Sequence, residues 1–405
     1  MTFDVAVVGG GPAGALTAYH LAKSGVQVAI VDAERFPRDK ACGGGIQTKA
    51  NAYIPFDWSG AVRSALSEVR FSFKFGDQFV RRHSRPLVYG VLRREFDNLL
   101  LESACRAGAS LIEGRRVQQL IAVPQGMSRL VTDDGELRAR FIVGADGANS
   151  IVRRQLNTGE EFFWQVGLYC EIPCEMVTPA VESCNRMIVD WGTLSSGYAW
   201  VFPKNDFVNI GVGSPVSQGP NLRAYLRSFI ASFGLVKPEA LSRLAFSGHK
   251  LPTLTSRAVL AREPFLLVGD AAGLIEPLTG EGISFACHSA RLASQVLLSR
   301  LCGECPDLAR YERLVHVEIV PELFWSRKLL SLAVAFPRAL YSAVRNNEHV
   351  WEAFCGVLTG SVSYRTLKQK LLGRWDFLWG LVHRYAAQTE RRKLSPAQAM
   401  NLSLG

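Results

Sequence analysis

Short apolar runs that end in glycine open the chain and recur twice along it. Val5 to Val8 leads into a glycine-rich turn and a helix through Leu21, and Val26 to Val31 follows as a second buried strand. The runs Phe141 to Val143 and Leu266 to Val268 show the same change from buried strand to glycine turn. Strands that alternate with helices in this way predict an α/β domain of Rossmann type.

The hydrophobic pattern changes in the second half of the chain. Alternating apolar stretches predict strands of an antiparallel sheet at Val166 to Ile172, Met187 to Trp191, Tyr198 to Phe202 and Val208 to Val212. After about residue 303 the period becomes helical. The expected helices are Tyr311 to Phe324, Lys328 to Val344, Val350 to Leu358 and Tyr364 to Tyr385.

These patterns predict an α/β fold with three parts. A Rossmann-like domain would be discontinuous and take residues 1–75, 91–160 and 260–303. An inserted antiparallel β-sheet domain would take residues 161–259, together with strands at 76–90. A C-terminal helical region would occupy residues 304–405.

The first glycine turn, Gly9-Gly10-Gly11-Pro12-Ala13-Gly14, has the composition of a dinucleotide-binding fingerprint. Gly9 makes the tight turn, Gly11 lets the backbone approach a pyrophosphate, and Gly14 allows the helix to pack closely on the strand. The N–H groups and the dipole of the helix would face the phosphates. Asp32, at the end of the second strand, is placed to bind ribose hydroxyls, and an acid there favours FAD or NAD.

Two later turns extend the prediction to FAD. Gly144-Ala145-Asp146-Gly147 and Gly269-Asp270 both follow buried strands, and Asp270 is placed for the ribityl chain. Gly280, Gly282 and Ile283 begin a helix, Ser284 to Leu301, whose N-terminus could face the flavin N1 and C2 carbonyl. Its dipole would stabilise an anionic reduced flavin.

With these segments the chain resembles the aromatic-hydroxylase superfamily of flavoproteins and, within it, the geranylgeranyl reductase family. Three segments carry the narrower resemblance: Phe36 to Gly44, which contains Lys40-Ala41-Cys42-Gly43-Gly44; Tyr198 to Lys204 followed by Asn209-Ile210-Gly211; and Val362-Ser363-Tyr364-Arg365. Ser195 stands where the family usually has a proline. The resemblance implies that Arg93 contacts FAD, that Cys42 lies beside the flavin, and that the inserted sheet binds substrate.

The resemblance implies reduction of C=C bonds in a long isoprenoid chain. An isolated alkene is a poor hydride acceptor, so it needs proton-first or concerted addition. The transition state then carries carbocation character, which aromatic faces stabilise. Alternation places Tyr198, Trp200 and Phe202 on one strand face, next to Pro203, as a wall for substrate binding and catalysis. Cys42 could donate a proton, order its glycine loop or act as a redox switch. Simple strand packing of the aromatics and a plain turn at Cys42 are the structural alternatives.

Two other functions remain open from the sequence. An FAD-dependent monooxygenase or halogenase would share the FAD motifs, and a protein that binds flavin and lipid without turnover would share the glycines and Asp270. NADPH and ferredoxin are the candidate reductants, and the choice between them stays open because the chain contains no second complete dinucleotide fingerprint. No metal cluster is expected.

Composition narrows the setting of this chemistry. The formal net charge of +10 suits an anionic substrate or membrane surface, and no nucleic-acid motif accompanies it. The stretch Lys368 to Arg384 mixes basic residues with tryptophans and could lie at a bilayer interface or pack on the flavin domain. The N-terminus lacks the pattern of a signal peptide, and nine scattered cysteines favour a reducing compartment. We therefore expect a cytoplasmic protein with peripheral membrane contact.

Overall fold

An eight-stranded sheet forms the nucleotide-binding half of the computed structural model, which describes residues 1–123, 126–156, 162–182, 186–194, 196–216, 221–255 and 258–367. Its main path runs β17-β18-β11-β1-β2-β8, and β9 and β10 extend it beside β11. The central pairs are parallel, as the alternating pattern predicts. The strands are β1 (Thr2–Val8), β2 (Val28–Val31), β8 (Ser110–Ile112), β9 (Val117–Ile121), β10 (Ser128–Thr132), β11 (Gly135–Gly144), β17 (Ala261–Arg262) and β18 (Phe265–Leu267).

Helices cover this sheet and build the largest apolar core of the protein. The helix α1 packs against both α2 and α6, and all three contribute buried side chains to that core. Their bounds are α1 (Pro12–Lys23), α2 (Arg93–Arg106), α3 (Ile151–Leu156) and α6 (Ile283–Leu301). The sheet and these helices form the Rossmann-like domain predicted from the chain's pattern.

A seven-stranded sheet forms the second half, in the order β16-β12-β15-β14-β13-β5-β6. Its pairs are antiparallel except β5 with β13, which run parallel. The strands are β5 (Glu68–Phe73), β6 (Asp77–Arg82), β12 (Phe162–Pro173), β13 (Arg186–Trp191), β14 (Tyr198–Lys204), β15 (Phe207–Pro215) and β16 (Ser247–Leu254). The early strand β5 thus belongs to this sheet, although it precedes the boundary expected at residue 76.

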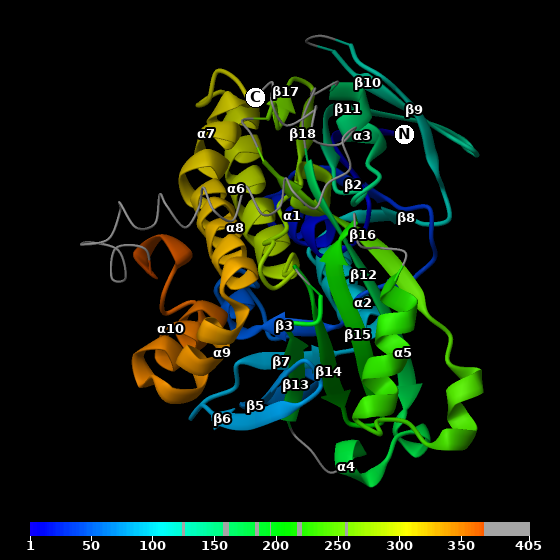
Figure 1. Cartoon of the computed structure of the whole chain (residues 1–405). Coiled ribbons are helices and arrows are strands. Elements are labelled where there is room, and N and C mark those ends of the chain that lie inside the picture. The colour runs from blue at the N-terminus through cyan, green and yellow to red at the C-terminus, as the bar shows by residue number, and fades with distance from the viewer. Residues whose placement is uncertain are drawn as a thin grey trace, which may run out of the picture.

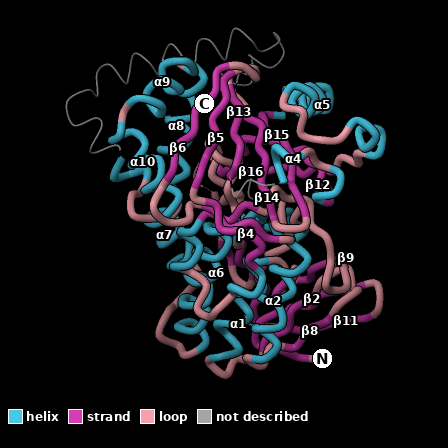
Figure 2. Tube along the Cα trace, turned by 90° about the horizontal axis from the view of Figure 1, so that it is seen from below, coloured by secondary structure: helices cyan, strands magenta, loops and turns pink. Residues whose placement is uncertain are grey.

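Smaller elements join the two halves and cover the outer face. A three-stranded sheet, in the order β3-β7-β4, consists of β3 (Gly45–Gln47), β4 (Val62–Leu66) and β7 (Val88–Val91). The helix α5 (Leu222–Ser232) packs on one face of the seven-stranded sheet, near the short helix α4 (Pro179–Glu182). The C-terminal helices lie on the opposite side of this sheet from α5 (Figures 1 and 2).

The C-terminal helices are α7 (Ala309–Glu318), α8 (Val320–Ala335), α9 (Pro337–Asn346) and α10 (Glu348–Thr359). The prediction of single helices over 311–324 and 328–344 is wrong, because one helix ends at Glu318 and another at Ala335. Pro321 and Pro337 occupy first-turn positions of α8 and α9, where a proline's missing N–H costs nothing. Most of the helix expected from Tyr364 to Tyr385, including the basic stretch from Lys368, lies outside the described residues.

Within the described ranges, no helix is both long enough and apolar enough to span a bilayer. Cys302 and Cys305, which are three residues apart in the sequence, are both free thiols, and so is Cys170.

Candidate active site

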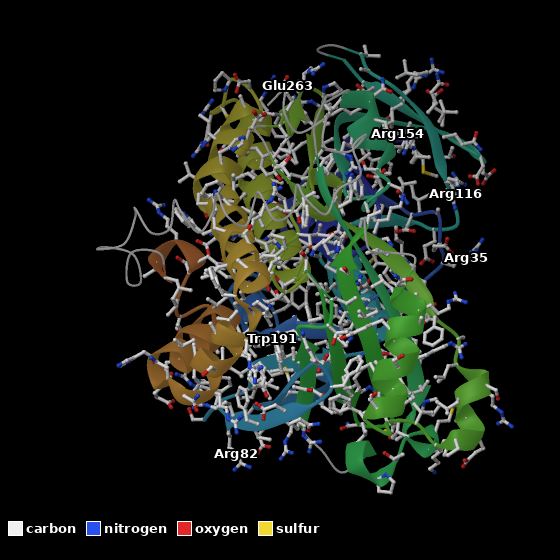
Figure 3. All side chains as sticks on the ribbon, viewed as in Figure 1. Arg35, Arg82, Arg116, Arg154, Trp191 and Glu263 are labelled. Carbon is white, nitrogen blue, oxygen red and sulfur yellow. The ribbon has the colours of Figure 1, made fainter. Side chains whose placement is uncertain are left out.

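One large cavity lies between the two halves and has a volume of about 1480 Å³. Pockets for a single small ligand usually measure about 300–1000 Å³. This cavity therefore has room for a dinucleotide and a second ligand. Arg116 and Arg154 line it toward the nucleotide-binding end, and Trp191 lines it toward the C-terminal helices. Figure 3 shows Trp191 far from the two arginines.

The first glycine turn forms the floor of one end. Gly9 has φ +104°, and a side chain there would overlap the carbonyl oxygen of Ala145. A side chain on Gly14 would overlap the carbonyl of Gly9, so Gly14 serves helix packing and does not face the cavity. At Gly11 an added Cβ would meet only the Arg38 guanidinium, at 3.7 Å. The backbone is thus open at the one glycine where a pyrophosphate must approach.

The helix behind this turn suits an anion. Among the described residues no side chain caps the first turn of α1, whose N-cap is Gly11. Its free N–H groups therefore face the cavity with the positive end of the helix dipole. Ala13 lies in that first turn and lines the cavity.

Two aspartates frame the turn. Asp32 accepts hydrogen bonds from the backbone N–H groups of Gly10, at 2.6 Å, and Glu34, at 2.9 Å, which fixes its carboxylate at the cavity edge. Asp146 accepts one from Ile151 through Oδ2, at 2.6 Å, while its buried Oδ1 has no partner in the described chain. Burial raises the pKa of Asp146. Because an unpaired buried carboxylate oxygen is costly, this atom fits a ligand hydroxyl or N–H group.

Arg93 reaches the cavity from the start of α2. Its guanidinium donates two hydrogen bonds of 2.8 Å to Asp97, which is fully buried and also pairs with Arg38 at 3.1 Å. Asp97 therefore holds both arginines in place beside the dinucleotide turn. Gly147, from the second glycine turn, lines the same cavity.

The loop from Pro277 to Gly282 borders the centre of the cavity, where Asp270, Gly280, Gly282 and Ile283 all line it. Burial raises the pKa of Asp270, and the charges of Lys40 and Arg93 oppose that rise. The helix α6 begins at Ile283 after this loop, with Gly282 as its N-cap.

A buried carboxylate anchors that loop. Glu276 accepts hydrogen bonds from the backbone N–H of Leu278, at 2.6 Å, and Thr279, at 3.0 Å, and from the hydroxyls of Thr279, Ser326 and Tyr364. Ser326 lies in α8, and Tyr364 belongs to the Ser363-Tyr364-Arg365 segment. One side chain thus connects the loop to the C-terminal region, and no local pattern in the sequence indicates this role.

Three aromatic rings form a wall on the sheet side. Tyr198, Trp200 and Phe202 all line the cavity, with ring centroids 5.7 Å and 6.2 Å apart along the row. The Trp200 indole packs directly against Gly211 of β15, where any side chain would overlap it. The Tyr198 hydroxyl donates to the Thr279 carbonyl, and burial raises the pKa of this tyrosine. Pro203, which was expected with them, does not line the cavity.

The Cys42 loop lies across this wall. An added Cβ on Gly43 would be 3.2 Å from the Trp200 indole nitrogen, and one on Gly45 would be 2.9 Å from Phe202. The glycines therefore let the backbone touch the rings directly. Cys42 lines the cavity, and its Sγ accepts a hydrogen bond of 3.3 Å from the Gly44 N–H.

A polar network fixes the loop relative to the wall. Asn209 accepts from Trp200 Nε1 at 2.8 Å and donates to the Cys42 carbonyl at 3.2 Å. It also approaches Glu171, at 3.4 Å, which pairs with the buried Lys204. Burial lowers the pKa of Lys204, and Glu171 opposes that effect. These residues act from behind the wall and hold its rings in position.

Lys40 and His249 form a second pair that sequence reasoning missed. Both line the cavity, with Lys40 Nζ 3.5 Å from His249 Nε2. Burial and the charge of Arg93 lower the pKa of Lys40. Burial, Lys40 and Arg93 together lower the pKa of His249 to about 4. Perturbed groups in a cleft are candidates for proton transfer.

The far part of the cavity lies among the C-terminal helices. Every residue of α8, α9 and α10 that lines it is apolar: Leu329, Leu330, Leu332, Ala333, Val334, Pro337, Leu340, Ala343, Val344, Val350, Ala353, Phe354, Val357 and Leu358. Trp191 closes the sheet side there, and its Nε1 donates to the Pro337 carbonyl at 3.3 Å. The cavity thus runs from a polar nucleotide end to an apolar end.

The fold and this site together define an FAD-dependent oxidoreductase, and comparison with known proteins agrees. Residues 2–169 match the family of FAD binding domains. Over 320 residues the chain is 34% identical to an uncharacterized protein of Methanosarcina barkeri, covering 78% of this chain and 80% of that protein. It is 30% identical over 360 residues to a menaquinone reductase of Mycobacterium tuberculosis, covering 83% and 85%.

A geranylgeranyl diphosphate reductase of Rhodobacter capsulatus is 31% identical over 319 residues, covering 76% of this chain and 78% of that one. The chain belongs to the geranylgeranyl reductase family of FAD-dependent oxidoreductases, which act on C=C bonds.

Solved structures share the fold. A geranylgeranyl bacteriochlorophyll reductase-like protein of Thermoplasma acidophilum superposes with a TM-score of 0.73 at 22% identity, covering 91% of this chain and 98% of that chain. A flavin-dependent brominase gives a TM-score of 0.70 at 16% identity, covering 92% and 99%. At these identities the likeness is one of fold.

Proposed function

We propose that this chain uses reduced FAD to saturate C=C bonds of a long isoprenoid chain. The observation that carries the proposal is the continuity of the cavity, from the FAD-binding turns past the aromatic wall into the apolar space between α8, α9 and α10. A long apolar chain could lie in that space while one of its double bonds lies against the wall. Relatives named for reduction of geranylgeranyl and quinone compounds support this substrate class.

Bound FAD, when reduced, supplies a hydride. The residues of the chain would do the rest. Trp200 and its neighbours present electron-rich faces to the positive charge that develops on the alkene. We assign proton donation to the Cys42 thiol, which lies in the loop on this wall, and resupply of that proton to the Lys40–His249 pair. NADPH or ferredoxin would reduce the flavin.

Contact with a membrane surface is a further part of the proposal. Phe324 in α8 is 50% exposed, and Phe336, directly after that helix, is 41% exposed. The same helix lines the apolar part of the cavity. Exposed aromatic residues there would let a lipid chain pass from a bilayer to the cavity. Sedimentation with phosphatidylglycerol vesicles, compared between the wild type and a Phe324→Ser, Phe336→Ser variant, tests this contact.

An anaerobic single-turnover experiment tests the reaction. Protein reconstituted with FAD is reduced with dithionite, and a geranylgeranyl compound is added without oxygen. We expect the flavin to reoxidise and the product mass to rise by about 2 for each bond reduced, since hydride and proton are added together. Turnover only after admission of oxygen, with a gain of about 16, would identify a monooxygenase and contradict the proposal. An unchanged mass of the geranylgeranyl compound under both conditions would identify a protein that binds without turnover.

A further inference from the structure

Two buried glutamines line the cavity with unpaired oxygens. Gln47, at the end of β3, is 5% exposed, and Gln165, in β12, is 6% exposed. Both side chains reach the cavity, and Oε1 of each has no hydrogen-bond partner within the part of the chain that the structure describes. Buried polar atoms are rarely left without a partner, so each oxygen points to a ligand group.

The chemistry of their partners fixes which amide atom is free. Gln47 Nε2 lies 3.0 Å from Thr279 Oγ1, whose single hydrogen is donated to Glu276. Thr279 can therefore only accept from Gln47, which places the amide nitrogen there. Gln165 Nε2 lies 3.0 Å from the Pro277 carbonyl oxygen, which can accept and never donate. Neither amide can be turned around, so both free atoms are acceptors.

Both glutamines hold the same short loop and face the same part of the cavity, at its centre. Pro277 and Thr279 are two residues apart, and Glu276 and Glu281 flank them. Glu281 is buried, lines the cavity and lies 3.5 Å from its counter-ion Lys49. Acceptor oxygens among carboxylates would repel a diphosphate or another anion. They suit a neutral group that carries a hydrogen.

We propose that Gln47 and Gln165 form a subsite for an uncharged N–H or O–H donor, which keeps anionic groups away from this part of the cavity. Two sources carry that chemistry. One is the imide N3–H of the flavin, and the other is a hydroxyl on the head of the substrate. The second source rests on the proposed function, whereas the first depends only on FAD.

The flavin arm of the test asks whether the donor is the flavin N3–H. It compares the affinities of the protein for FAD and for N3-methyl-FAD, measured by fluorescence titration after the bound flavin has been removed. Wild type should bind the methylated cofactor about 3- to 10-fold more weakly than FAD, the range for one neutral hydrogen bond. Gln47→Met and Gln165→Met should each be titrated with both cofactors. The variant whose oxygen receives the N3–H should bind the two cofactors with the same affinity.

The substrate arm compares geranylgeraniol with its methyl ether, which lacks the hydroxyl hydrogen, and with geranylgeranyl diphosphate. Binding is followed by the change in the absorbance of the bound oxidised flavin. The alcohol should bind about 3- to 10-fold more tightly than the ether in the wild type and equally with it in the relevant Met variant. The diphosphate should bind more weakly than the alcohol.

Gln119→Met is the matched control, because Gln119 is exposed on β9 and does not line the cavity. It should keep the wild-type ratios in both arms. The subsite is overturned if the wild type binds FAD and N3-methyl-FAD equally and also binds geranylgeraniol and its methyl ether equally. This comparison uses the wild type alone, so it does not depend on the folding of a variant. Discrimination in the flavin arm, with no binding of any prenyl compound, would instead leave the subsite intact and contradict the proposed function.

Discussion

The indole nitrogen of Trp200 donates a hydrogen bond to Asn209 Oδ1 over 2.8 Å, and Asn209 donates in turn to the carbonyl of Cys42. The aromatic wall and the cysteine loop are therefore positioned by one amide. Asn209 is fully buried, so neither bond is exchanged for water.

Asn209→Leu should break both bonds and leave the Trp200 N–H unpaired in the interior. An unsatisfied buried donor costs about 1–3 kcal/mol, which we expect as loss of unfolding free energy in urea. Turnover should fall more than FAD affinity, because the displaced groups are the wall and the loop. Asn346→Leu, at an exposed position in α9, is the control. An equal loss of FAD affinity and turnover would show that Asn209 acts only on stability.

Gly14→Ala should prevent FAD binding. The added methyl group would overlap the Gly9 carbonyl, so α1 could not pack against the dinucleotide turn. The measurement is the flavin absorbance retained after reconstitution and desalting. Gly60→Ala serves as the control, because an added Cβ there meets nothing within 4 Å. A yellow Gly14→Ala protein with wild-type affinity would contradict the assigned role of this turn.

Cys42→Ser should keep FAD and lose most turnover. Serine can accept the same hydrogen bond from the Gly44 N–H, so the loop should retain its shape while the thiol is lost. Cys302→Ser, at an exposed thiol, controls for general effects of losing a cysteine. The flavin spectrum and anaerobic rate are measured together. Full activity would reduce Cys42 to a residue of the turn.

His249 should make the protein sensitive to acid. Its pKa is about 4 in the folded chain, lowered by burial and by Lys40, against 6.5 when unfolded. The unfolded chain thus takes up a proton first as the pH falls, so stability is complete above pH 6.5 and declines between 6.5 and 4. The loss should reach up to about 3 kcal/mol.

His249→Gln should remove that share of the acid dependence. Urea unfolding at about pH 7.5 and about pH 4.5 measures it as the difference between wild type and variant. His349→Gln, at an exposed position, should leave the dependence unchanged. If the unfolding free energy falls equally with pH in the wild type and in His249→Gln, the acid sensitivity belongs to other groups.

The glycine turns were predictable because each motif is local. A strand, a turn and the start of a helix lie within about 20 residues of sequence, and the cavity lies where these elements meet. The aromatic wall followed from strand alternation, and the same rule argues against Pro203, which lies one step along from Phe202 and so points to the other face. The broken C-terminal helices were also readable, because Pro321 and Pro337 are typical of a first helical turn.

The polar contacts of the site could not be predicted from local sequence patterns. Gln47 and Thr279 are 232 residues apart, Lys40 and His249 are 209 apart, and Gln165 and Pro277 are 112 apart. Nothing in the sequence near any of these residues specifies its partner. Such pairs depend on how three sheets and the C-terminal helices assemble, which a single sequence does not encode in a local pattern.

The apolar lining from α8, α9 and α10 offers a chain no hydrogen bond that would hold it at one depth. Dispersion contacts vary little as a chain of repeating units slides by one repeat. A polyprenyl tail in this space would have several nearly equal stopping points, spaced by the length of an isoprene unit. The number of bonds saturated would then depend on how deeply the tail can enter, so a bulkier residue at Leu358 or Ala353 would shorten the travel and leave distal double bonds untouched.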